Sequence, residues 1–165
     1  MRFFDEKFRD NKFRYIAQAA LGGIAAAAAL VFFDVVNHPA IIASFGASTL
    51  VAFAAPHQRF ARPRYLVGGY IIGVTVGCLI HYVTIFPIEP YLAQKLIHLL
   101  AGGVAVGLAI FFMAVTNTEH APAAGIALGF VINDWTFHTV VMVMIGIIVI
   151  SAIQRILRPW MIDLI

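Results

Sequence analysis

Four apolar runs, each long enough to cross a lipid bilayer, constrain this sequence more than any other feature. They cover residues 15–36, 65–86, 92–115 and 137–157. A membrane-spanning helix needs about 20 mainly apolar residues, because each residue advances a helix by about 1.5 Å across a hydrocarbon layer about 30 Å thick. Only 12% of the 165 residues are charged, about half the share usual in soluble domains. We therefore expect an all-α integral membrane protein that forms a single transmembrane domain over residues 1–165, with residues 1–14 as a cytoplasmic amphipathic N-terminus.

Two shorter apolar segments, residues 39–55 and 121–132, lie between the long runs. A histidine, His38 or His120, comes directly before each segment, and a proline, Pro39 or Pro122, lies at its beginning. Proline fixes its own backbone and disfavours helix in the residue before it. We therefore predict two short broken helical segments in addition to the four long helices, with regular helix starting only at Gly46 in the first segment and at Gly125 in the second.

The positions of the charges favour a topology in which both short segments cross the membrane. In that case the basic residues near the two termini and those of the 57–64 loop lie on one side, which satisfies the positive-inside rule with both termini cytoplasmic. If the short segments instead folded back on themselves, Arg59, Arg62 and Arg64 would lie outside the cell, against the rule. The crossing topology is therefore the one that we expect.

Three crossings in each half of the chain imply an inverted repeat. The halves are residues 15–86 and 92–157, and an odd number of crossings inverts the second half relative to the first. Many transporters are built in this way, with a pseudo-two-fold axis in the membrane plane.

Glycines recur every fourth residue in two of the long runs. Gly69, Gly73 and Gly77 lie in the first half, and Gly103 and Gly107 lie in the second. Because such stripes let membrane helices approach closely, we expect both to be packing surfaces.

A helix that begins inside a membrane leaves its first N–H groups free, and these groups together with the helix dipole favour an anion. We expect the two short helices to begin facing each other and to bind a small monovalent anion between them. Nitrite, nitrate or a halide would suit such a site. The predicted substrate-binding residues are Ser44, Phe45, Gly46, Ala47, Ser48, Thr49, Ala124, Gly125 and Ile126. The alternative is that a side chain or water caps each break, which then only kinks the helix.

Four further residues are candidates for gating or proton handling. His38 and His120 open the two short segments, and histidine is the side chain that most readily changes charge near neutral pH. Lys95 and His98 share one helix face and are placed to draw anions toward the site, unless Lys95 only extends toward lipid headgroups.

No metal, cofactor or nucleic acid is expected as a partner. The chain has one cysteine, and no two histidines have metal-ligand spacing. The net charge of +3 comes from clusters near the predicted membrane surfaces, which indicates membrane orientation rather than a nucleic-acid footprint. The lipid bilayer is the expected partner, and a homo-oligomer is left open.

Two stretches of the sequence resemble the HPP family of integral membrane proteins. Residues 43–50 read ASFGASTL, Pro56 follows, and residues 61–69 read ARPRYLVGG, where the family typically reads FGAS, then P, then AQPRN and GG. The second short segment is similar to the family's HPPAGATAL. The chain departs from the family pattern at Arg62, Tyr65, Tyr70 and Ala121, where the family has glutamine, asparagine, histidine and proline.

The resemblance implies a transport function, since some plant members of this family are associated with nitrite transport into plastids and bacterial members are commonly taken to be similar. It therefore implies a nitrite transporter or channel in a bacterial inner membrane. Two alternatives remain: an aquaporin-like channel for water or small neutral solutes, and a non-transporting sensor or assembly subunit. An enzyme is not expected, because no Gly-x-Ser-x-Gly elbow or catalytic triad accompanies Ser44 or Ser48.

Overall fold

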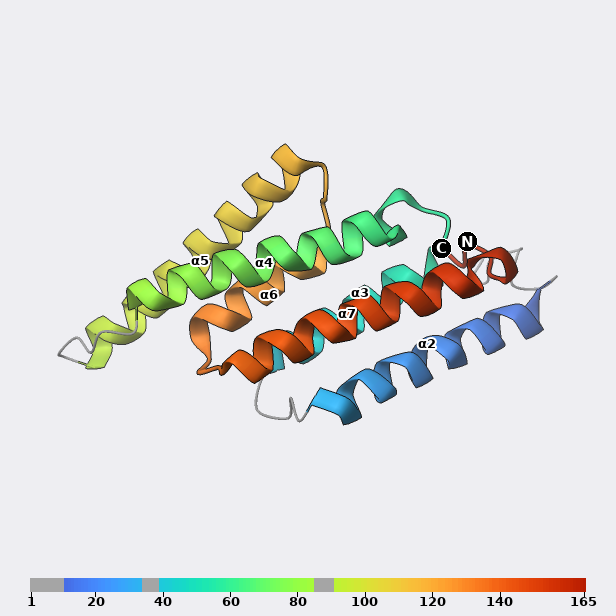
Figure 1. Cartoon of the computed structure of the whole chain (residues 1–165), viewed down its shortest axis with the longest axis horizontal. Coiled ribbons are helices and arrows are strands. Elements are labelled where there is room, and N and C mark those ends of the chain that lie inside the picture. The colour runs from blue at the N-terminus through green and yellow to red at the C-terminus, as the bar shows by residue number, and fades with distance from the viewer. Residues whose placement is uncertain (1–10, 34–38, 85–90) are drawn as a thin grey trace, which may run out of the picture.

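The computed structural model describes residues 11–33, 39–84 and 91–165, which form helices and connecting turns (Figure 1). The helices are α2 (Lys12–Phe33), α3 (Pro39–Ala54), α4 (Pro63–Thr84), α5 (Tyr91–Thr116), α6 (Ala121–Ile132) and α7 (Phe137–Leu157), with short 3-10 turns η2 (Arg59–Ala61) and η3 (Arg158–Trp160). No strand occurs in the described ranges, so the all-α expectation is confirmed there.

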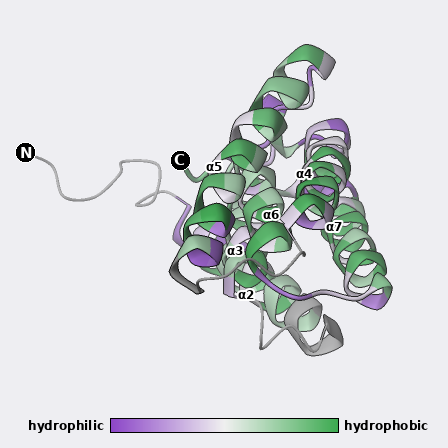
Figure 2. Cartoon of the chain, turned by 90° about the vertical axis from the view of Figure 1, so that its left-hand side faces the viewer, coloured by the Kyte–Doolittle hydropathy of each residue, from purple (hydrophilic) through white to green (hydrophobic). Residues whose placement is uncertain are grey.

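Three of these helices are long and apolar enough to cross a membrane. They are Pro63–Thr84, Ala93–Thr116 and Phe137–Trp160, of 22, 24 and 24 residues, and they match three of the four expected spans. The fourth expected span coincides with α2 up to Phe33, and its last three residues lie outside the described part of the chain. A spanning role for α2 therefore stays a prediction. Hydrophobic residues dominate the helices in Figure 2, as lipid contact requires.

Successive helices run in alternating directions, so their ends gather at two poles of the bundle (Figure 1). At one pole Gln18 Nε2 donates to the carbonyls of Phe53 and Ile162, which joins the start of α2, the end of α3 and the C-terminal segment. At the opposite pole the rings of His81 and Trp135 lie 5.3 Å apart, which joins the end of α4 to the α6–α7 turn. Neither α3 nor α6 folds back on itself, and whether the two helices cross the membrane stays a prediction.

The expected breaks at Gly46 and Gly125 are wrong. Helix α3 runs without interruption from Pro39 through Gly46, and α6 runs from Ala121 through Gly125. The prolines mark the helix starts themselves, because the first helical turn has no use for the N–H that proline lacks and its fixed backbone angle suits a helix. The N–H groups at the two glycines are therefore inside regular helix.

The glycine stripe of α4 packs against α6, as expected. A Cβ atom at Gly69 would lie 2.7 Å from the Cβ of His120, and one at Gly77 would lie 2.8 Å from the carbonyl oxygen of Ala127. The stripe of α5 has no such partner in the described chain, because a Cβ at Gly103 or Gly107 would meet nothing within 4 Å. The packing prediction therefore holds for the first stripe and fails within this chain for the second.

The pattern of helix packing is what an inverted repeat would produce. Exchanging α2, α3 and α4 for α5, α6 and α7 converts the α2–α3 contact into α5–α6, α4–α6 into α3–α7, and α4–α5 into α2–α7. All six contacts are present, although α3–α7 and α2–α7 are much less extensive than α4–α6 and α4–α5. The α3–α6 and α4–α7 contacts, also present, map onto themselves. The repeat itself stays a prediction.

Candidate functional site

A cluster of three polar side chains lies inside the bundle, where α3, α4 and the start of α6 meet. Ser48 Oγ is 2.8 Å from the Tyr70 hydroxyl and 2.9 Å from His120 Nε2. Ser48 and Tyr70 are fully buried, and His120 is 1% exposed. The ring of Tyr70 lies near those of Phe45 and His120, with centroid distances of 5.4 and 5.9 Å. Polar groups in such an apolar interior are costly unless they are paired.

The end of α5 directs the chain inward toward this cluster. Asn117 adopts a left-handed conformation (φ 53°), the N–H of Thr118 donates to the carbonyl of Met113 (2.9 Å), and the N–H of Asn117 donates to that of Ala114 (3.3 Å). These two bonds form a Schellman motif with asparagine in the position usually taken by glycine. The extended His120 then caps α6 without a hydrogen bond from its side chain to the helix.

The chain between α5 and α6 needs the space that two glycines of α4 leave. A Cβ at Gly68 would lie 2.8 Å from Thr118 Cγ2, and one at Gly69 would lie 3.2 Å from the Thr118 carbonyl oxygen. These approaches are possible only because glycine has no side chain. Gly68 and Gly69 therefore set the depth at which His120 enters the bundle.

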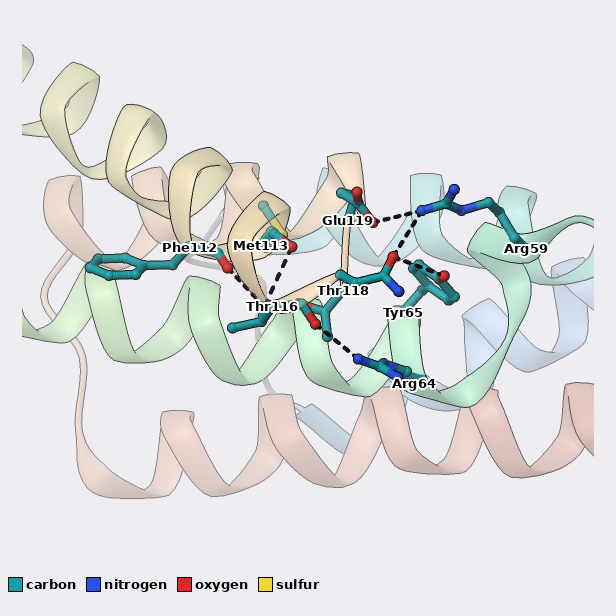
Figure 3. A network of polar contacts seen from close by, with 9 residues as sticks. Arg59, Arg64, Tyr65, Phe112, Met113, Thr116, Thr118 and Glu119 are labelled. Carbon is teal, nitrogen blue, oxygen red and sulfur yellow. Dashed lines mark hydrogen bonds and ion pairs between the residues drawn. The ribbon is translucent and has the colours of Figure 1, made fainter.

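An exposed polar network fastens the same connection from outside (Figure 3). Arg59 Nη2 donates to Asn117 Oδ1 (3.0 Å) and to Glu119 Oε2 (3.1 Å). Tyr65 also donates to Asn117 Oδ1 (3.3 Å), and Arg64 donates to the carbonyl of Thr116 (3.0 Å). The α3–α4 loop is thus tied to the segment that carries His120.

One polar atom of the cluster has no hydrogen-bond partner in the described structure. This atom is His120 Nδ1, which is buried. If Tyr70 donates to Ser48 and Ser48 donates to Nε2, both hydroxyl hydrogens are used and the proton of the neutral imidazole is on Nδ1. The opposite tautomer leaves Nδ1 as an unpaired acceptor, and it also leaves one hydroxyl hydrogen, that of Tyr70 or that of Ser48, without an acceptor in the cluster. The assignment with fewer unpaired groups therefore makes Nδ1–H a free donor beside the start of α6.

The structure separates the predicted substrate-binding residues. Ser48 joins the cluster, but Ser44 Oγ donates to the carbonyl of Ala40 and Thr49 Oγ1 to that of Phe45, both within α3. Gly46 and Ala47 are on the exposed side of α3, and Gly46 lines a groove toward α2.

The expected space between two facing helix starts is not present. A Cβ at Gly125 would lie 2.5 Å from Ser44 Oγ, so α3 and α6 are in close contact at this point. Ile126 is buried and Ala124 is half-buried. Whether any of these residues binds a substrate stays a prediction, but the geometry first expected for the site is wrong.

The gating candidates that the structure describes do not lie together. His38 lies outside the described residues. Lys95 is exposed, and His98 Nδ1 lies 3.0 Å from the carbonyl of Gln94. Both are near the start of α5, and His98 is about 27 Å along the helix axis from the α5 end that leads to His120. Of the three that the structure describes, only His120 belongs to the buried cluster.

Tyr70 is the member of the cluster that sequence reasoning did not select. It was noted only because the HPP pattern has histidine at its position. Its position directly after Gly69, beside the stripe that packs against α6, is the signal that could have identified it. For metals, no group of three His, Cys, Asp or Glu side chains able to hold an ion occurs in residues 11–33, 39–84 and 91–165.

Comparison with protein families decides the class of this chain. Residues 9–161 match the family described as "HPP, transmembrane region". The chain belongs to the HPP family. With three helices of span length, this HPP protein is a multi-pass membrane protein.

Two relatives are transmembrane proteins of Dictyostelium discoideum. They are 36% and 31% identical to this HPP protein over 88 residues, which is 53% of its chain in each case. The matched part is 26% of one relative and 28% of the other, so the match spans about a quarter of their length. No solved structure matches it.

Proposed function

We propose that this HPP protein transports a small monovalent anion, and that the anion binds beside His120. The family resemblance implies nitrite as the substrate and a bacterial inner membrane as the setting, and the loop charges favour cytoplasmic termini. Family membership, the spanning helices and the buried cluster support this proposal.

The unpaired Nδ1 of His120 is the observation that carries the proposal. A free donor inside an apolar bundle costs about 1–3 kcal/mol if it stays unsatisfied, and ionisable groups inside membranes usually serve a transport path. The Nδ1–H is next to the start of α6, where the helix dipole adds partial positive charge. Both effects favour an anionic oxygen, so the anion-binding role moves from Gly46 and Gly125 to the beginning of α6.

Ser48 and Tyr70 act on His120 as positioning residues. Their hydroxyl chain ends on Nε2 and so keeps the proton on Nδ1, toward the anion. The packing pattern that an inverted repeat would produce also supports a transporter, because alternating access in many carriers depends on two inverted halves.

Anion flux into liposomes tests the proposal. Purified protein is reconstituted, and uptake of nitrite, nitrate, chloride and formate is recorded with and without a pH gradient. We expect nitrite uptake above that of protein-free liposomes. We expect His120→Gln to reduce it about tenfold or more, because a hydrogen bond to a charged group contributes about 1.5–3 kcal/mol.

A matched pair of variants separates the cluster from general damage to α3. Ser48→Ala removes the hydroxyl that bonds to His120, whereas Thr49→Val removes a neighbouring buried hydroxyl that bonds only within its own helix. Ser48→Ala should lower the flux and Thr49→Val should not. Equal flux in wild type and His120→Gln would refute the site, and no anion uptake by the wild type would refute the function.

A further inference from the structure

A second polar site lies away from the cluster, where α4 begins and α7 ends. A pocket of about 250 Å³ is lined by Arg62, Pro63, Gln154, Arg155 and Arg158. It is several times larger than the roughly 30 Å³ that one water molecule occupies in the liquid. Its lining combines three guanidinium groups and contains no carboxylate.

The three arginines of this pocket have no acidic partner in the described chain. The ion pairs found there join Arg59 to Glu119 and His57 to Asp163, and none involves the pocket. Like charges gathered in one cavity repel each other unless an anion neutralises them. The electrostatics of the pocket therefore call for a negative ligand.

Two buried polar atoms at the pocket lack partners. Arg158 Nε has none in the described structure, although the atom is shielded from solvent. Gln154 is 1% exposed, and its Nε2 donates to the carbonyl of Pro56 (3.1 Å), so its orientation is held while its Oε1 remains unpaired. A phosphate ester has oxygens that would accept from Arg158 Nε–H, and a hydroxyl group on the same ligand would donate to Gln154 Oε1.

Membrane orientation alone does not account for this arrangement. Arginines at the last turn of α7 are favoured by the helix dipole and by the positive-inside rule. Those effects act on each arginine separately and do not explain why Arg62, from the start of α4, converges with Arg155 and Arg158 on one cavity. The exposed Trp160 nearby (81%) is typical of the headgroup level of a membrane.

We propose that the Arg62–Arg155–Arg158 pocket binds a phosphate group, either that of an anionic lipid such as phosphatidylglycerol or free inorganic phosphate. Guanidinium groups pair with phosphate oxygens through two parallel hydrogen bonds, and basic pockets between membrane helices suit anionic headgroups. This site is independent of the transport proposal, because none of the residues that line the pocket belongs to the His120 cluster.

The test measures binding to the delipidated protein in detergent. Short-chain phosphatidylglycerol, short-chain phosphatidylcholine and inorganic phosphate are titrated separately, with thermal unfolding and native mass spectrometry as readouts. We expect phosphatidylglycerol to bind at least tenfold more tightly than phosphatidylcholine. Binding of inorganic phosphate without selectivity for phosphatidylglycerol would assign the site to the free ion.

Variants then locate the binding. Arg155→Gln changes an exposed side chain of the pocket, and Arg62→Gln/Arg158→Gln removes the other two charges; both should lower the affinity at least tenfold. Arg14→Gln removes an exposed charge of α2 that is outside the pocket, and this variant should leave the affinity unchanged. Equal affinities in Arg155→Gln and Arg14→Gln would overturn the proposal, as would a wild type that binds neither phosphate nor phosphatidylglycerol selectively.

Discussion

Replacing Gly73 by alanine should destabilise the bundle, whereas the same change at Gly103 should not. An added Cβ at Gly73 would lie 3.2 Å from the carbonyl carbon of Ala123 and closer still to its oxygen. Backbone atoms of α6 cannot rotate away as a side chain can. At Gly103 the new methyl group would meet nothing within 4 Å.

The expected magnitude follows from two opposing effects. Alanine favours helix over glycine by about 0.8–1.0 kcal/mol at both positions, so this effect cancels in the comparison. Overpacking costs about 1–3 kcal/mol and applies at Gly73 alone. The two variants should therefore differ by about 1–3 kcal/mol in the free energy of unfolding.

Thermal unfolding in detergent, followed by circular dichroism, measures this difference. A change of about 1 kcal/mol corresponds to about 2–4 °C in Tm for a protein of this size, so Gly73→Ala should melt roughly 2–12 °C below Gly103→Ala. Equal melting temperatures would show that α4 and α6 do not approach each other at Gly73 as closely as described.

Two further predictions concern the segment between α5 and α6. Asn117→Val should be about 1–2 kcal/mol less stable than Asn117→Gly, because both lose the bonds to Arg59 and Tyr65 but only valine is strained in the left-handed conformation; equal unfolding free energies would contradict that conformation. For the exposed Arg59–Glu119 pair, a double-mutant cycle of Arg59→Gln and Glu119→Gln should give a coupling of about 1 kcal/mol or less. That coupling should shrink at high salt, and a salt-independent value would argue against an exposed ion pair.

Prolines mark the starts of two helices. Pro39 and Pro63 are the first residues of α3 and α4, which is where proline is most easily accommodated. The expectation of a late helix start failed because a proline near the beginning of a segment was interpreted as an interruption. At the first turn of a helix, proline removes only an N–H that had no partner in the helix.

The glycines show a different limit of sequence reasoning. Gly73 and Gly103 have equivalent settings in the sequence, yet one packs on α6 and the other faces outward. In a soluble protein, polarity would mark the exposed face of a helix. In a membrane protein, the lipid-facing and protein-facing sides are both apolar, so the pattern of residues does not show which side is packed.

By itself, the sequence determined that this chain is a helical membrane protein of the HPP family and where several of its helices begin, because hydropathy and proline act locally along the chain. It also identified His120 and Ser48 as candidate site residues. Only the tertiary structure decided that Ser48, Tyr70 and His120 meet and that Gly46 does not face Gly125. It also decided that Arg62 joins Arg155 and Arg158. Such meetings depend on how α3, α4, α6 and α7 rotate about their axes, and that rotation is set by packing between helices rather than by any single segment.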